Sequence, residues 1–419
     1  MMTLKIAWRS FVRHRVRSAI TSLAVALGLA MMLVFVGFAD DTHARMAELG
    51  IRMGSGHVLV EGKGYLDNQT LDYLVHDADR IAASAARIAH VKHVAVRLKT
   101  SGLLSAGEHS APVLISGVEP SREALASDMA GPKMRVAGAY LRSLDQMPYA
   151  KTPPDIYLGK GLAEQLAVTL GDRVVLNLSP PGDAEPTAGA FRVRGIFRTG
   201  VDDLDGAYAE IPIAAARTLL GLPGAATEVA LLSDLAHTEE VAAAMKAELA
   251  ANPDLVVIPW QVALRGLHEA LVLDSAGMYL MMAIVYLVVA IGIFNTVLMG
   301  VSERTREFGV LLALGTSSRR LFAQVFAEAL VLALISLTAG LIIGLSIHGW
   351  IATHGIDLTQ WLGDVQFAGV AWSGRVYSHL TPQVVVGWTA VVGAVVLLSS
   401  LYPALRVMRL EPVEAMHHV

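Results

Sequence analysis

The chain has 419 residues, of which 54% are hydrophobic and only 17% are charged, and its mean hydropathy is +0.52. Soluble proteins carry about 25% charged residues, so this composition excludes an ordinary soluble enzyme. Cysteine is absent. Its absence excludes a disulfide framework, thiolate metal sites and a cysteine nucleophile.

Four stretches contain no Asp, Glu, Lys or Arg, and each exceeds the roughly 20 apolar residues that cross a bilayer core. They are 18–39, 275–302, 329–356 and 376–405. We therefore predict an α-helical membrane protein with four transmembrane helices. Residues 40–274 are numerous enough for an α+β domain with its own core, in two lobes. This segment carries a net charge of −9 and the remainder +5, which opposes nucleic-acid binding by the domain.

The distribution of Lys and Arg near the spans predicts the orientation, because the cytoplasmic side is enriched in both. Basic residues concentrate before the first span and after the second: Lys5, Arg9, Arg13, Arg15, Arg17, Arg304, Arg306, Arg319 and Arg320. The loop between the third and fourth spans holds only Arg375, and the tail 406–419 holds Arg406 and Arg409. We expect both termini and the loop 303–328 in the cytoplasm, and 40–274 outside.

The first 17 residues have a basic amphipathic pattern that suits a helix on the inner leaflet, or simply the positive flank of the first span. Gly37-Phe38-Ala39 resembles a signal-peptide cleavage site. However, the apolar run of 22 residues is longer than the 7–15 residues of a signal peptide, which favours a retained anchor.

Within 40–274, strand-like and helix-like segments alternate. Strands are expected at Val91–Leu98, Ala111–Val118, Arg173–Leu178, Phe191–Phe197 and Leu255–Pro259. Helices are expected at Leu71–Ala89, Lys160–Ala167, Ile213–Leu219 and Thr238–Ala251. An Asp-rich segment at 202–206 does not have the spacing of an EF-hand loop and is interpreted as an acidic turn.

Apolar residues recur at helical spacing on both sides of this domain: Met46, Leu49 and Met53 after the first span, and Leu264, Leu267 and Leu271 before the second. No proline interrupts 261–301, so a single helix could extend about 60 Å. Two such helices would pack as a stalk. The alternative is that both seams face the core of the domain.

The third span carries a stripe of small residues, Ser336, Gly340 and Gly344. Such a stripe permits close helix approach in lipid, either within one chain or across a dimer.

The sequence contains no phosphate-binding G-x-x-x-x-G-K-[ST] loop and no H-E-x-x-H motif. The spans contain no ionisable pair of the kind that proton-coupled transporters use. The chain therefore shows no energy source of its own.

The loop after the second span has the most specific sequence, with Glu303, Arg304, Arg306 and Glu307 beside an apolar patch of Phe308, Leu311 and Leu312, and with Gly315 placed to end the helix. Thr316, Ser317 and Ser318 then offer N-cap oxygens for the next helix. A short helix with an apolar patch and charged edges suits a groove on another protein. A helix resting on lipid headgroups is disfavoured because two Glu side chains would face an anionic surface.

This segment, S-E-R-T-R-E-F-G-V-L-L-A-L-G at 302–315, resembles the signature of the MacB/FtsX/LolCDE-type permeases, the mechanotransmission (type VII) ABC transporters. The tail Y-P-A-L-R-V-M-R-L-E-P-V-E-A at 402–415 is similar to the closing segment of that family, except at Val407, where Ala is usual. L-G-K-G-L-A at 158–163 and L-G-D at 170–172 resemble a turn in its outer domain. The resemblance covers essentially the whole chain.

The resemblance implies a non-catalytic permease of the inner membrane that pairs with a second permease subunit, identical or paralogous, and with two copies of an ABC ATPase. The segment 303–315 would be the coupling helix that docks on the ATPase. No cofactor would bind to this chain, because ATP and Mg²⁺ would bind to the ATPase. The outer domain would convert ATP-driven closure into work outside the membrane.

Three kinds of work occur in this family. The 195–205 region resembles the LolC/LolE lipoprotein-release branch, so lipoprotein release is favoured. MacB-like efflux through a periplasmic adaptor is the first alternative, although MacB carries a fused ATPase domain that this chain lacks. FtsX-like activation of cell-wall hydrolases, or sensing without transport, is the second.

Overall fold

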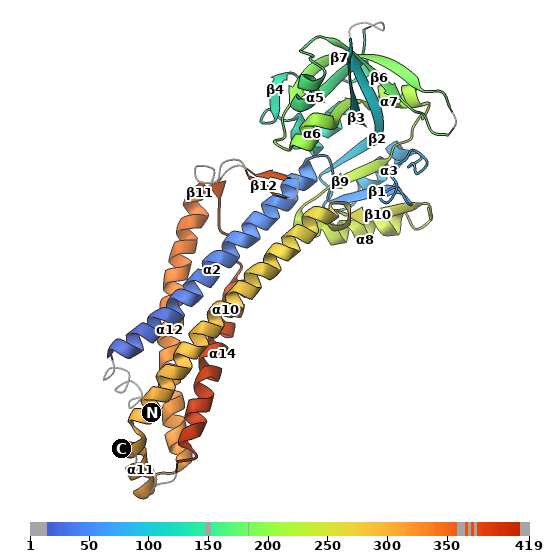
Figure 1. Cartoon of the computed structure of the whole chain (residues 1–419). Coiled ribbons are helices and arrows are strands. Elements are labelled where there is room, and N and C mark those ends of the chain that lie inside the picture. Colours follow the sequence, from blue (N-terminus) through green and yellow to red (C-terminus); the bar gives the residue numbers. More distant parts are fainter. Residues whose placement is uncertain are drawn as a thin grey trace. The chain divides into compact units, whose positions relative to one another are not determined.

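The computed structural model describes residues 15–146, 152–182, 184–357, 365–367, 370–372 and 375–410 (Figure 1). The chain divides into two compact units. The membrane unit comprises Met1–His43, Val272–Trp361 and Gly374–Val419, and the inserted domain comprises Ala44–Leu271 with Leu362–Ser373. The basic helix predicted over 1–17 lies outside the described residues except for its last three positions.

Long apolar helices form the membrane unit. They are α2 (Arg15–Arg52), α10 (Arg265–Glu303), α12 (Ser318–His354) and α14 (Pro382–Val407), with the short α11 (Thr305–Ala313) between α10 and α12. Within the described part of the chain, four helices are long and apolar enough to cross a membrane, and these are α2, α10, α12 and α14. Helices α2 and α10 each contain a whole charge-free stretch, whereas the third stretch ends two residues after α12 and the fourth begins before α14.

Helix α2 lies at the centre of the apolar packing in the membrane unit. Its buried residues repeat at helical spacing and share one cluster with side chains of α10, α12 and α14: Val25, Leu29, Met32, Leu33, Val36, Met282, Tyr286, Ile293, Leu332, Ala333, Val392 and Val396. Half of the most apolar window of α2 is buried, against 17% for α10 and α14. The latter two helices therefore keep most of their apolar surface available for lipid or for other helices.

Two short pairs of strands follow α12. Strand β11 (Ile356–Asp357) pairs with β14 (Arg375–Val376), and β12 (Val365–Phe367) pairs with β13 (Val370–Trp372). Both pairs are antiparallel.

The inserted domain is built on a mixed sheet of ten strands in the order β10-β1-β9-β2-β3-β8-β5-β7-β4, with β6 paired to β2 and β7. The strands are β1 (Val58–Gly62), β2 (His93–Ala106), β3 (His109–Val118), β4 (Arg135–Gly138), β5 (Asp155–Gly159), β6 (Arg173–Leu178), β7 (Thr187–Phe197), β8 (Tyr208–Pro212), β9 (Glu228–Leu232) and β10 (Leu255–Pro259). The pairs β3–β8 and β5–β7 are parallel, and the remaining pairs are antiparallel.

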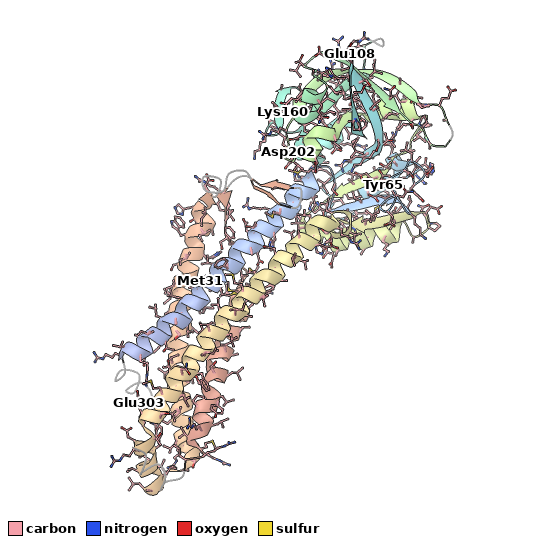
Figure 2. All side chains as sticks on the ribbon, in the orientation of Figure 1. Met31, Tyr65, Glu108, Lys160, Asp202 and Glu303 are labelled. Carbon is pink, nitrogen blue, oxygen red and sulfur yellow. The ribbon has the colours of Figure 1, made fainter. Side chains whose placement is uncertain are left out.

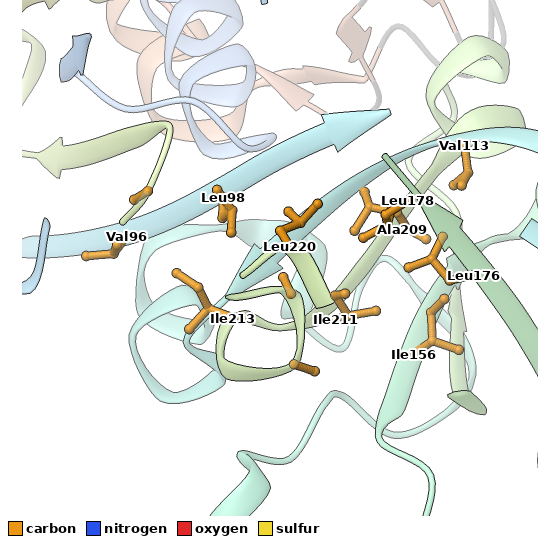
Figure 3. Close-up of a cluster of buried hydrophobic side chains, with 14 of the residues drawn as sticks. Val96, Leu98, Val113, Ile156, Leu176, Leu178, Ala209, Ile211, Ile213 and Leu220 are labelled. Atoms are coloured by element: carbon orange, nitrogen blue, oxygen red, sulfur yellow. The ribbon is translucent and has the colours of Figure 1, made fainter. Parts of the chain in front are cut away.

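Short helices connect these strands. They are α3 (Ala78–Ala85), α4 (Pro120–Ala126), η1 (Asp128–Ala130), η2 (Leu144–Gln146), α5 (Lys160–Gln165), α6 (Asp202–Ala207), α7 (Ile213–Leu220), η3 (Leu235–His237), α8 (Thr238–Glu248) and α9 (Trp260–Ala263). The 14-residue strand β2 pairs with β9 at its start and with β3 and β6 further along. It therefore joins the two halves of the sheet, where two lobes were predicted. One apolar cluster extends through both halves (Figure 3).

The structure differs from the sequence predictions in two elements that matter here. The helix predicted over 261–301 is interrupted at Leu264 (φ −107°, ψ 51°), because the single turn of α9 holds Trp260 buried before α10 begins. The helix expected at 71–89 is limited to α3. Strands β1, β5, β8 and β9 were not predicted, since every residue of each is buried and no alternation marks them.

Candidate functional site

The helix between the second and third spans, α11, is separated from its neighbours at both ends. Arg304 has a non-helical conformation (φ −108°, ψ 10°) and separates α11 from α10. At the other end, Gly315 has φ +88° and donates to the carbonyl of Leu312, while Thr316 donates to that of Leu311, both at 3.0 Å. This is a Schellman ending, which requires a residue that accepts positive φ. Gly315 ends the helix as the sequence predicted.

One face of α11 is buried in the membrane unit itself. Phe308 is 1% exposed and packs in a cluster with residues of α10, α12 and α14: Val301, Leu321, Val325, Ala404 and Val407. Leu312 packs partly against the same cluster. We predicted Phe308 and Leu312 as part of a docking patch, and this assignment is wrong for Phe308, because the ring fills the chain's own core.

The rest of α11 carries exposed apolar side chains, with Val310 and Leu314 turned away from Phe308 and Leu311 beside it. Val310 is 44%, Leu311 36% and Leu314 79% exposed. Arg306 and Glu307 beside them are also exposed. We call Val310, Leu311 and Leu314 together the outward patch. The sequence analysis did not single out Val310 and Leu314, although they share a helix face at i, i+4 spacing.

Ion pairs hold the inner ends of the helices together. Arg304 donates to both carboxylate oxygens of Glu328 on α12, at 2.9 and 3.2 Å, and its guanidinium lies 5.1 Å from the centre of the Phe308 ring. Arg17 at the start of α2 contacts Glu303 at the end of α10 at 3.0 Å (Figure 2 labels Glu303). Glu303 and Arg304 were predicted to flank the docking patch, but both side chains are engaged inside the membrane unit.

The predicted stalk residues lie at the far ends of α2 and α10. Met46, Leu267 and Leu271 are buried, and Leu49, Met53 and Leu264 are half-buried. A groove is lined by Met53 on one side, by Leu264 and Leu267 on another, and by Leu204 of α6 on a third. One residue of the first seam and two of the second therefore line the same groove as Leu204. The stalk remains a prediction.

A polar contact also joins α2 and α10 between the seam residues and the charge-free stretches. His43 of α2 lies 2.8 Å from a carboxylate oxygen of Asp274 on α10. With the Arg17–Glu303 pair, it links α2 to α10 at both ends of the apolar segment.

The small residues of α12 pack against α2. A Cβ added to Gly340 would lie 2.9 Å from the carbonyl oxygen of Ala26, and one added to Gly344 would lie 3.0 Å from the Cα of Ala30. Ser336 is fully buried and donates to the carbonyl of Leu332 at 2.7 Å. Of the two alternatives for this stripe, the structure shows packing within one chain.

The inserted domain contains a buried charge network at the end of α2, which the sequence analysis missed. Arg97 is fully buried and donates to both oxygens of Glu123, to Glu228 and, at 2.6 Å, to the carbonyl of Ser55. Lys99 pairs with Glu228 at 2.9 Å and donates to the carbonyl of Gly54 at 3.0 Å. Two cations on β2 therefore hold the chain where it leaves α2.

Two carboxyl groups near this network form no ion pair within 4 Å among the described residues, although Lys99 lowers the pKa of Glu61 and Arg97 lowers that of Glu210 in part. Burial, and then repulsion from Glu228, raises the pKa of Glu61 to about 7. Burial, and then repulsion from Glu123, raises the pKa of Glu210 to about 8, although Tyr140 donates to it at 2.8 Å. Glu61 and Glu210 each stand alone in their strands, so the sequence did not indicate that both would be buried near the same charge network.

Comparison with known proteins identifies this architecture. A family model described as MacB-like periplasmic core domain matches residues 18–248, and one described as FtsX-like permease C-terminal matches residues 279–412. The lipoprotein-releasing system transmembrane protein LolC of Xylella fastidiosa (strain Temecula1 / ATCC 700964) is 25% identical, over 94% of this chain and 92% of its own length.

Two further relatives cover the chain almost completely. The lipoprotein-releasing system transmembrane protein LolE of Haemophilus influenzae is 24% identical, over 94% of this chain and 93% of its own. The macrolide export ATP-binding/permease protein MacB of Nitrobacter winogradskyi is also 24% identical, over 98% of this chain but only 59% of its own length.

The fold thus defines a multi-pass membrane protein with a large α+β domain between its first two spans, as the sequence predicted. The chain belongs to the family of FtsX-like permeases with a MacB-like periplasmic core domain, because these two models together match most of it. The resemblance drawn from residues 302–315 is confirmed. The protein is an ABC transporter permease of the LolC/MacB/FtsX type in the inner membrane.

Proposed function

We propose that this permease releases lipoproteins or lipids from the inner membrane, driven by a separate ABC ATPase. The observation that carries the proposal is the length of the match to the lipoprotein-releasing proteins LolC and LolE, which the chain covers over more than nine-tenths of their lengths. MacB, whose name includes an ATP-binding part, is covered over only 59%. The given sequence contains no nucleotide-binding loop, and we propose that a partner chain supplies the ATPase.

The outward patch of α11 is the proposed ATPase contact. Apolar side chains that a short helix presents beside charged ones suit a groove on a partner protein. The buried ring of Phe308 and the Arg304–Glu328 pair fix this helix to the bundle, so a force applied to the patch reaches α10 and α12 directly. We propose two ATPase copies and a second permease subunit, identical or paralogous.

Transmission to the inserted domain is proposed to follow α2 and α10. Each is a continuous helix of 38 or 39 residues, and the Arg17–Glu303 and His43–Asp274 pairs connect them. The charge-free spans offer no polar path for a soluble substrate, which favours work outside the membrane over transport through it.

The distribution of Lys and Arg supports both termini and α11 facing the cytoplasm. Because the chain lacks cysteine, Glu185→Cys and Ser317→Cys would each introduce a unique thiol. An impermeant maleimide added outside should label the first in intact spheroplasts and the second only after lysis. Equal labelling of both before lysis would contradict this orientation.

Depletion of the protein in its host tests the function. Inner and outer membranes are separated after depletion, and the lipoproteins in each are quantified. Accumulation of lipoproteins in the inner membrane, reversed by the wild-type gene, is expected. If the distribution stays normal while macrolide sensitivity rises, MacB-like efflux replaces the proposal. If cells instead fail to separate, FtsX-like activation of hydrolases replaces it.

A further inference from the structure

Two histidines and a glutamate from distant parts of the inserted domain meet at its surface. His90 lies in the connection between α3 and β2, His237 ends η3, and Glu240 is in the first turn of α8. One ring nitrogen from each histidine and one carboxylate oxygen all lie within 4.8 Å of one another. His90 Nε2 is 3.8 Å from Glu240 Oε2.

The two imidazoles are held in a specific arrangement. Their rings stack with centroids 3.9 Å apart and 6° between the planes. An imidazole nitrogen binds a metal ion in the plane of its ring, so one of the two stacked rings must turn about its Cβ–Cγ bond for both to bind the same ion. His237 Nδ1 is also inaccessible to solvent and has no hydrogen-bond partner among the described residues. Such a nitrogen is uncommon in folded proteins unless a water molecule or an ion satisfies it.

The backbone at His90 adds a second constraint. Its φ is +67°, in the left-handed region where Asn, Asp and His are enriched among non-glycine residues. The conformation directs the side chain of His90 onto the ring of His237.

We propose that His90, His237 and Glu240 form a binding site for a divalent transition-metal ion of the zinc class, with water in the remaining positions. Two imidazoles and one carboxylate suit Zn²⁺, Cu²⁺ or Ni²⁺, whereas Ca²⁺ and Mg²⁺ prefer oxygen ligands alone. Zinc–nitrogen distances of about 2.0–2.1 Å place tetrahedral donors roughly 3.3 Å apart. Glu240 is exposed, so a rotation of its side chain closes the site.

The charges around the site permit a cation. Lys92, the nearby base, is paired with Asp234 at 2.5 Å, which neutralises it. Glu239 is exposed next to Glu240 and adds negative charge. The site is therefore net acidic when both imidazoles are neutral.

Metal binding would join elements that are remote in sequence. The ion would connect the start of β2 to the start of α8, which packs on β10 and β1. A ligand that binds the folded state alone stabilises it by mass action. The site thus goes beyond the proposed lipoprotein release and does not depend on it.

The test uses the full-length protein purified in detergent without a polyhistidine tag. His417 and His418 are replaced by serine in every sample, since adjacent tail histidines could bind metal on their own. Zinc chloride is titrated by calorimetry, and thermal unfolding is followed with and without the metal. Binding of one Zn²⁺ per chain and a higher melting temperature in zinc are expected, with no effect of Mg²⁺.

The variants His90→Gln and His237→Gln should each abolish this binding, and Glu240→Gln should weaken it at least tenfold. The matched control His109→Gln, at the exposed start of β3, should bind zinc as the parent does. Melting temperatures without zinc show whether each variant is folded. Zinc binding that survives in His90→Gln and in His237→Gln, or no binding by the parent at 100-fold molar excess, would overturn the proposal.

Cu²⁺ offers a readout of the ligands themselves. Electron paramagnetic resonance of the Cu²⁺-loaded parent should show coupling to two imidazole nitrogens, and each single histidine variant should lose the signal or keep one nitrogen. A parent spectrum with no imidazole coupling would also overturn the site.

Discussion

Phe308 and Leu311 are neighbours at i, i+3 on α11, yet Phe308 is 1% exposed in the core of the membrane unit while Leu311 is 36% exposed. One residue therefore anchors the helix and the other is available to a partner. Their separate roles make the coupling hypothesis testable, because substitutions at the two positions should affect different quantities.

Substitution on the outward patch should release the ATPase without unfolding the permease. Leu311→Asp and Leu314→Asp place a charge where a partner groove would be apolar, and loss of a buried anchor at an interface costs about 2 kcal/mol or more. We expect at least a tenfold loss of ATPase co-purification at an unchanged melting temperature. Phe308→Ala should instead lower the melting temperature, since removing a buried aromatic ring costs about 3–5 kcal/mol.

The control is Leu170→Asp, which makes the same change at a comparably exposed leucine (45%) of the inserted domain. It should leave co-purification unchanged. Retention of the ATPase by both patch variants would show that α11 is not the docking element.

Close packing of α12 on α2 predicts that Gly340 tolerates no side chain. Gly340→Leu would force the helices apart, because a Cβ there already lies 2.9 Å from the Ala26 carbonyl. We expect a lower melting temperature in detergent. Gly349→Leu on the same helix has no atom within 4 Å of the added Cβ and is the matched control. Equal melting temperatures for the two variants would contradict the packing.

The buried acids predict that the inserted domain loses stability as pH rises. The pKa of Glu210 is raised to about 8 and that of Glu61 to about 7. Each protonated acid favours the folded state fully below its unfolded pKa of about 4.5. That contribution is lost as pH rises through the folded pKa, since the unfolded chain releases its proton first. The melting temperature of the inserted domain's transition should fall between pH 5 and pH 8.5.

Glu210→Gln should flatten this pH dependence, because an amide has no proton to release. Glu108→Gln, on an exposed carboxylate of the same domain, is the control and should leave the slope unchanged. A slope of equal size in the Glu210→Gln variant would contradict the assignment.

A kink in α10 should uncouple ATP hydrolysis by the ATPase from lipoprotein release by the inserted domain. Leu271→Pro removes one helix hydrogen bond and introduces a steric clash, at a cost of about 3 kcal/mol. The ATPase should still bind and hydrolyse ATP, while lipoprotein release, measured by membrane fractionation, should fall to the level of depleted cells. Leu271→Ala keeps the helix and should retain most of the release. Normal release by the proline variant would show that α10 is not a rigid transmitter.

Local chemistry made several features of this protein predictable from its sequence. A charge-free stretch of more than 20 residues determines a span by its own composition, because an unpaired charge in the bilayer core is costly. The ending of α11 was also predictable, since Gly315 is the residue that accepts its positive φ. The order of residues 302–315 then indicated the family.

Only the tertiary structure decided which side chains meet. Phe308 and Leu311 are both apolar, and their burial depends on where α12 and α14 pass, which no local pattern records. Arg97 meets Glu123 and Glu228, and His90 meets His237, only after strands and helices remote in sequence are brought together. Contacts of this kind arise from packing of whole elements, and the free energy that selects them belongs to the folded domain rather than to any one segment.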